Sequence, residues 1–159
     1  MSVYGRYKKL GIDGFRNLVS LLETTPQEKR RKMIEVGMNE DADYTAEAIK
    51  YLMSFADVLG LGELELSELL ARVPLRIIAL SIHPLPEDVR MRFLTHAPRK
   101  KQADLKLMIE SSAPALGLVG GAQLQMVGHL RELEKNGLIR LKRLPEKLEL
   151  AGSARRASA

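Results

Sequence analysis

Apolar residues recur along most of the chain at the three-to-four-residue interval of amphipathic helices. The clearest case is a helix predicted over 12–23, whose inward side is marked by Phe15, Leu18, Val19 and Leu22. Prolines and glycines divide the remainder, because they favour helix ends over helix interiors. The further helices predicted on this basis cover 26–37, 42–56, 63–73, 75–82, 86–96, 98–112 and 119–136.

Three positions suggest how individual helices begin and end. Thr25 is a suitable N-cap before Pro26, and Glu28 completes the spacing of a capping box. Gly37 is predicted to end that helix in the left-handed conformation, and Gly137 has the same role after 119–136. Residues 1–9 are expected to be a loose basic lead-in.

Gly60 and Gly62 interrupt an otherwise apolar stretch that runs from Tyr51 to Val73. Two glycines inside one helix would cost about 2 kcal/mol relative to alanine, so a break between two helices is expected. Helix should resume near Glu63. We therefore predict a joint between about Leu52 and Gly62 that separates two helical groups.

These elements predict an all-α fold, arranged as a short array of helix pairs. Aromatic residues make up only 4% of a chain that is 45% hydrophobic, which favours packed helices over sheets. Residues 138–150 are the exception, and a small C-terminal β-hairpin is predicted there. The expected division is 1–54, 55–143 and a flexible basic tail at 144–159.

The net charge of +5 is unevenly distributed, because residues 97–159 carry 12 basic and 6 acidic side chains. This pattern is typical of a solvated basic face, or of a surface for an acidic partner or nucleic acid. The absence of cysteine excludes disulfides and fits a reducing compartment. No stretch reaches the roughly 18 apolar residues of a membrane span, and no signal peptide is evident, so we expect a cytoplasmic protein.

No pattern for catalysis, metal binding or cofactor binding emerges. His83, His96 and His129 lack the spacing of metal ligands, and the glycine-rich segment 117–122 lacks the Lys-Ser/Thr of a phosphate loop. We therefore predict neither an enzyme nor a cofactor or metal site.

Two segments have interaction potential. The helix at 98–112 should place Leu105, Met108 and Ile109 inward and present a basic face formed by Arg99, Lys100, Lys101 and Lys106. This face is interpreted as a contact surface for an acidic protein partner. Separately, a helix followed by the basic segment 138–143 is compatible with a winged-helix DNA-binding domain at 118–150, and this remains the alternative function.

The order of segments over residues 10–143 resembles the C-terminal half of the flagellar motor switch protein FliG. The resemblance is carried by "LMSF" at 52–55, "FADVLGLGELELSELLARV" after it, "PEDVRMRFLTHAPRKK" and "AQLQMVGHLRELEKNGLI". It implies a right-handed armadillo-like helical group, a hinge and a helical torque domain. The hinge would comprise Leu52, Met53, Ser54 and Phe55, of which only Phe55 keeps the family's aromatic character.

The resemblance also implies a role and a set of charged positions. His83 falls where the family has a lysine, and Lys100 where it has an arginine. Leu107 and Met108 fall where the family has an acidic pair. The implied function is a non-enzymatic scaffold in motility and chemotaxis. Its partners would be switch-complex or stator-like proteins, or further copies docking through helical faces, at the cytoplasmic side of the membrane.

Overall fold

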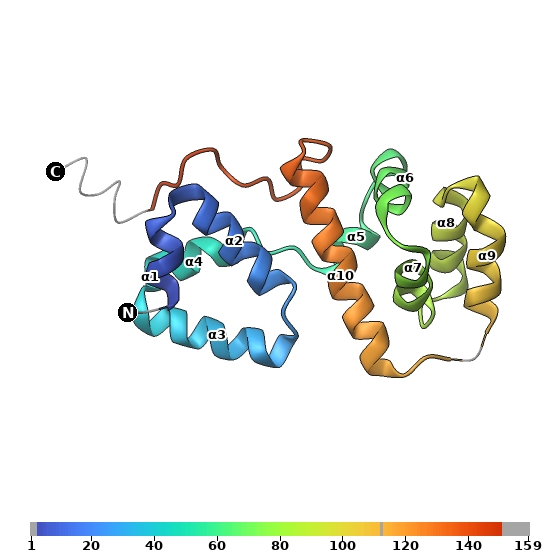
Figure 1. Cartoon of the computed structure of the whole chain (residues 1–159), viewed down its shortest axis with the longest axis horizontal. Coiled ribbons are helices and arrows are strands. Elements are labelled where there is room, and N and C mark those ends of the chain that lie inside the picture. The colour runs from blue at the N-terminus through green and yellow to red at the C-terminus, as the bar shows by residue number, and fades with distance from the viewer. Residues whose placement is uncertain (1–2, 112, 151–159) are drawn as a thin grey trace. The chain divides into compact units, whose positions relative to one another are not determined.

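The computed structural model describes residues 3–111 and 113–150, and within these ranges every regular element is an α-helix (Figure 1). The predicted all-α fold is therefore confirmed. The helices in chain order are α1 (Val3–Lys9), α2 (Gly11–Glu23), α3 (Gln27–Glu40), α4 (Ala42–Lys50), α5 (Phe55–Leu59), α6 (Glu63–Arg72), α7 (Leu75–Ile82), α8 (Glu87–His96), α9 (Arg99–Glu110) and α10 (Leu116–Lys135).

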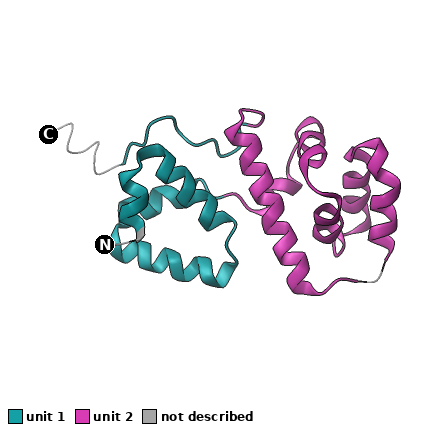
Figure 2. Ribbon diagram, viewed as in Figure 1, with its two compact units in different colours: residues 1–52, 140–159 teal, residues 53–139 magenta. Residues whose placement is uncertain are grey.

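The chain divides into two compact units, coloured separately in Figure 2. Unit 1 contains residues 1–52 together with 140–159, and unit 2 contains residues 53–139. The chain thus passes between units twice, once after Leu52 and once after Ile139. Unit 2 is an uninterrupted piece of sequence inserted into unit 1.

The core of unit 1 is built on one face of α2 and on α4. Phe15 of α2 makes edge-to-face contacts with Tyr44 and Tyr51, whose ring centroids lie 5.7 and 5.8 Å away. Such pairs add to the stabilisation that burial itself supplies. The other buried members of the cluster are Tyr4, Leu18, Val19, Leu22, Ala48, Leu144 and Leu150.

The first helix corrects the prediction of a loose lead-in at 1–9. Tyr4 is buried and its hydroxyl donates a hydrogen bond to the carbonyl oxygen of Met33. Gly14 of α2 allows close approach, because a Cβ there would collide with the carbonyl group of Tyr7. Tertiary packing therefore stabilises a short helix that local propensity does not favour.

Helix α3 begins and ends differently from the prediction. Pro26 is its N-cap residue rather than its first helical residue, and no side chain caps this end. The hydroxyl of Thr25 instead donates back to the carbonyl oxygen of Leu21, at 2.5 Å. Gly37 is buried inside the helix and does not end it. Its missing side chain makes room for Tyr4 and Thr45, which explains a glycine that looked like a helix stop.

The predicted break at the two glycines is confirmed. Helix α4 ends at Lys50, earlier than the predicted 56, and a short α5 precedes the break before α6. Gly60 and Gly62 have φ angles of −87° and −69°, so neither needs the left-handed conformation. A capping box starts α5, where the backbone N–H of Ser54 donates to the Asp57 carboxylate at 2.8 Å.

Unit 2 is organised around α7, which contacts both α9 and α10. Its apolar side is buried through Ile78, Ala79 and Ile82. Three long-range hydrogen bonds connect neighbouring segments: the Arg92 guanidinium donates to the carbonyl oxygens of Leu59 and Leu61, and Gln123 donates to that of Ser81. Helices predicted at 75–82, 86–96, 98–112 and 119–136 are confirmed within a few residues; Ser112 lies outside the described residues.

The predicted C-terminal hairpin is wrong, since residues 138–150 contain no strand. Gly137, with φ of 75°, ends α10 as predicted, but Lys142 also has a positive φ of 45°, and Pro145 lacks a backbone donor. Residues 144–150 are not free either, because Leu144, Leu148 and Leu150 pack on the unit 1 cluster. The rest of the predicted tail, 151–159, lies outside the described residues.

Candidate protein-binding surface

Helix α9 is held to unit 2 by a single fully buried side chain, Leu105. Its start is tied to the end of α8, because Gln102 donates a hydrogen bond to the carbonyl oxygen of Ala97 at 2.9 Å. Most of the remaining surface of α9 faces solvent. A helix with so narrow a buried stripe presents a broad surface on which partner-binding residues can be placed.

The predicted basic residues do lie on this exposed surface. Arg99, Lys100 and Lys106 are exposed, and Lys101 is half-buried. Asp104 and Glu110 are exposed on the same helix, four residues after Lys100 and Lys106 respectively. Because residues four apart are neighbours on a helix, the two acids partly offset the cations. The spacing of these two acids is visible in the sequence, but the predicted basic face did not include them.

Met108 does not face the core as predicted. It is 40% exposed, and its neighbour Leu107 is 67% exposed. Leu107 lies seven residues after Lys100, so the two share one side of α9. The positions that the FliG resemblance assigns to an acidic pair therefore present apolar groups at the surface.

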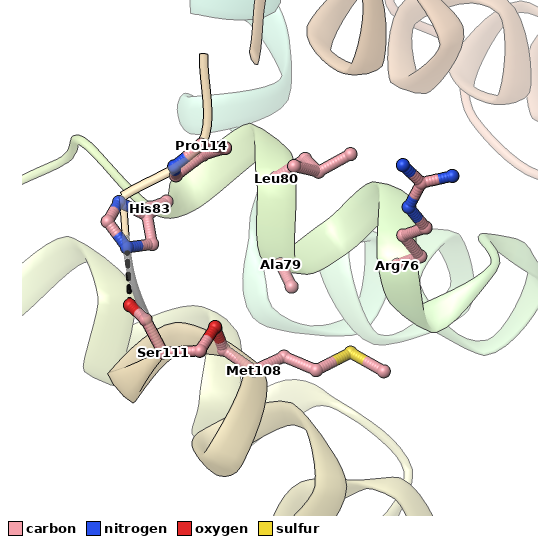
Figure 3. Close-up of a pocket in the computed structure, with 7 residues that line it drawn as sticks. All are labelled: Arg76, Ala79, Leu80, His83, Met108, Ser111 and Pro114. Carbon is pink, nitrogen blue, oxygen red and sulfur yellow. Dashed lines mark hydrogen bonds between the residues drawn. The ribbon is translucent and has the colours of Figure 1, made fainter. Parts of the chain in front are cut away.

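His83 follows the last turn of α7 and lines a hollow between α7 and the end of α9 (Figure 3). Its Nε2 atom lies 3.4 Å from the carbonyl oxygen of Ser111. The same hollow is lined by Arg76, Ala79, Leu80, Met108, Ser111 and Pro114. The hollow brings together residues as far apart in sequence as 76 and 114, so no local pattern could indicate it.

Lys106 lines a second hollow, which lies between α8 and α9. Its charged neighbours are Glu87, Arg90 and Glu110, and its apolar part comes from Met91, Leu94 and Ile109. Two acids and two bases share this lining, so it offers no net preference for an acidic partner.

The residues predicted as a hinge link α4 to α5. Leu52 packs against the unit 1 cluster, whereas Met53 is buried and belongs to unit 2. Ser54 is the N-cap of α5 and Phe55 its first residue. The structure thus places the boundary between units inside this predicted segment.

Two structural groups of unit 1 have shifted pKa values. Hydrogen bonding from Lys8 holds the pKa of Asp41 below its usual value, and burial raises the pKa of Tyr44 to about 12. Asp41 caps α4 and Tyr44 fills the core. Across the described part of the chain, no three His, Asp or Glu residues group in a way that could hold a metal ion. None of the helices in residues 3–111 and 113–150 meets the length and apolarity needed to cross a membrane.

Comparison with known proteins identifies a family that matches much of the chain. The profile of the FliG C-terminal domain matches residues 37–141. A search of curated protein sequences finds no significant match.

Three solved structures of FliG resemble the chain. Full-length FliG from Aquifex aeolicus has a TM-score of 0.52 at 22% identity, over 80% of this chain and 40% of that one. Two FliG fragments from H. pylori give TM-scores of 0.55 and 0.58 at 16% and 15% identity, over 80% and 79% of this chain. The aligned regions span 56% and 60% of those fragments. Identities this low support similarity of fold.

Proposed function

The chain belongs to the FliG C-terminal domain family, and we propose that it serves as a non-enzymatic interaction module of a flagellar motor switch. The observation that carries the proposal is the extent of the family match, which covers residues 37–141. It includes α4, the linking segment and every residue of unit 2. The role needs no catalytic step, only surfaces that hold partners.

In this proposal, unit 2 docks a protein partner through α9 and its neighbours. Arg99, Lys100, Lys101 and Lys106 would attract an acidic partner, and exposed Leu107 would add apolar contact area. Leu107 and Met108 stand where the family has its acidic pair. The contact would therefore use positive charge and apolar area, without the negative charges of its relatives. The partner expected by analogy is a switch-complex or stator-like protein on the cytoplasmic side of the membrane.

Unit 1 would attach the module to neighbouring subunits. The segment Leu52–Phe55 would connect this attachment to partner binding by unit 2. Support for a docking role of unit 1 comes from apolar side chains that remain exposed on α3 and α4, namely Val36, Met38 and Ile49. Helices that leave apolar groups in solvent are suited to association with a second copy.

No observation favours the alternative of DNA binding. A winged helix needs strands after its recognition helix, and residues 138–150 form none. This alternative is therefore not carried further.

The test is complementation of a strain that lacks this gene, scored by swimming and by recruitment of a fluorescent fusion to motor foci. The wild-type chain should restore both. The double variant Lys100→Glu/Lys106→Glu should still form foci, because reversing exposed charges costs less than about 0.5 kcal/mol each in stability. It should swim poorly, because the reversed charges no longer attract an acidic partner.

A matched control reverses two exposed arginines of unit 1 that lie outside α3 and α4, Arg6→Glu/Arg143→Glu. This control should swim like the wild type. Normal motility and flagellation in the deletion strain would refute the proposed function. Equal swimming by the double variant and its control would refute the role of α9.

A further inference from the structure

One side of α7 carries an arginine, two apolar residues and a histidine that line the hollow in Figure 3. Arg76, Ala79, Leu80 and His83 follow the i, i+3, i+4, i+7 spacing of a single helix face. The opposite wall comes from Met108 and Ser111 at the end of α9 and from Pro114. The lining contains no acidic residue, in contrast to the hollow between α8 and α9.

The two nitrogen-bearing side chains occupy opposite ends of this hollow. Figure 3 shows the Arg76 guanidinium at one end and the His83 imidazole at the other, with Leu80 and Met108 between them. Seven residues of helix separate their backbones by about 10.5 Å. Leu80 is half-buried and Met108 is 40% exposed, so the middle of the hollow offers accessible apolar surface.

We propose that this hollow, formed by Arg76, Ala79, Leu80, His83, Met108, Ser111 and Pro114, is a docking site for an acidic amphipathic helix of a partner protein. An apolar side chain of the partner enters between Leu80 and Met108. Two carboxylates placed seven residues apart on the partner reach Arg76 and His83. The proposal deepens the proposed function, since it names the kind of segment through which a partner of unit 2 would bind.

Charge and spacing together favour this occupant. A helix that lies along α7 has the same rise per residue, so acids at i and i+7 match the separation of Arg76 and His83. Its residues at i+3 and i+4 then face the apolar middle of the hollow. Arginine pairs well with carboxylates because its planar guanidinium can donate two parallel hydrogen bonds.

The test uses two synthetic helical peptides of identical composition and the full-length chain. The probe peptide is alanine-based, with capped ends, glutamate at positions 4 and 11 and leucine at positions 7 and 8. The control peptide moves the leucines to positions 6 and 9, on the opposite side of the helix from the glutamates. Binding is followed by NMR shifts of the ¹⁵N-labelled chain and by fluorescence anisotropy of labelled peptide.

The probe peptide should shift amide signals of residues 76–83 and 108–114 and bind at least tenfold more tightly than the control peptide. Arg76→Glu should weaken probe binding tenfold or more, and Met108→Gln should weaken it severalfold, because both side chains are exposed parts of the hollow. Arg31→Glu makes the same charge change on unit 1 and should leave binding unchanged.

Several results would overturn the proposal. These are equal binding of the two peptides, equal weakening by Arg76→Glu and Arg31→Glu, or shifts confined to other surfaces. Equal shifts from free glutarate would make the hollow a small-anion site instead. If a variant fails to fold, the NMR shifts that the two peptides cause in the wild-type chain still show whether the probe peptide binds at the hollow. Peptide binding at the hollow with normal motility of the deletion strain would refute the proposed function alone, and the reverse result would refute only this docking site.

Discussion

At the scale of single residues, Asp41 shows how one side chain can hold two elements. Its carboxylate accepts a hydrogen bond from the backbone N–H of Tyr44 at 3.2 Å, which caps α4. It also pairs with the Lys8 ammonium group at 2.7 Å, which ties α4 to α1. These contacts favour the ionised carboxylate and lower its pKa.

The sign of the pH effect follows from that lowered pKa. A group that is more acidic in the folded state stabilises the fold above its ordinary pKa near 4, and this contribution is lost as pH falls through the folded value. Asp41→Ala should cost about 1 kcal/mol at pH 7, because the helix loses its cap. The difference from wild type should shrink between pH 5 and pH 2.5 in urea denaturation series.

Asp41→Asn provides the control, since asparagine also caps helices but cannot pair with Lys8 as an anion. It should cost less than Asp41→Ala at pH 7. A cost for Asp41→Ala that does not change with pH would show that ionisation of Asp41 does not contribute to stability.

At the scale of helices, glycines that look alike in the sequence have opposite roles. Gly37 is buried in α3, and a Cβ there would lie 2.5 Å from Thr45 Oγ1 and 2.6 Å from Tyr4 Cζ. Gly120 of α10 is exposed, and a Cβ there would meet nothing within 4 Å. The first glycine permits close packing of helices, whereas the second only weakens its own helix.

We therefore expect opposite effects from the same substitution. Gly37→Ala should destabilise the chain by about 1–3 kcal/mol, the usual cost of overpacking a core. Gly120→Ala should stabilise it by about 0.5–1 kcal/mol through helix propensity. Thermal and urea denaturation of both variants test this pair, and stabilisation by Gly37→Ala would contradict the packing described for α3.

Helix positions were predictable from sequence where apolar spacing and prolines mark the helix. They were less predictable where tertiary packing determines whether a helix forms. Apolar spacing and prolines located α2 and α6–α10 within a few residues. The short helix α1 was missed because its stability comes from Tyr4 and Gly14. The exposure of Arg99, Lys100 and Lys106 was also predictable, but the inward position assigned to Met108 was wrong. The hollow beside His83 was not predictable, because residues as far apart in sequence as Arg76 and Pro114 line it together only in the folded chain.

At the scale of the whole molecule, the last described residues complete a core that the first residues begin. Leu144 is 3% exposed in the unit 1 cluster, whereas Leu138 is 44% exposed. Leu144→Ala should destabilise unit 1 by about 2–3 kcal/mol, and Leu138→Ala by less than about 1 kcal/mol.

Tyrosine fluorescence can isolate this effect. The chain has no tryptophan, and its four tyrosines, Tyr4, Tyr7, Tyr44 and Tyr51, all belong to unit 1. Leu144→Ala should lower the urea midpoint seen by fluorescence more than the midpoint of the remaining helical signal in circular dichroism. Equal midpoint shifts by both probes would mean that the two units unfold together.

The insertion of unit 2 within unit 1 also sets an order of events during protein synthesis. Residues 53–139 leave the ribosome as one continuous piece and can fold before residues 144–150 are available to unit 1. Residues 1–52 emerge first but must wait for Leu144, Leu148 and Leu150, the final part of their core. Apolar side chains such as Phe15 and Leu22 are therefore accessible to chaperones until residues 144–150 have left the ribosome.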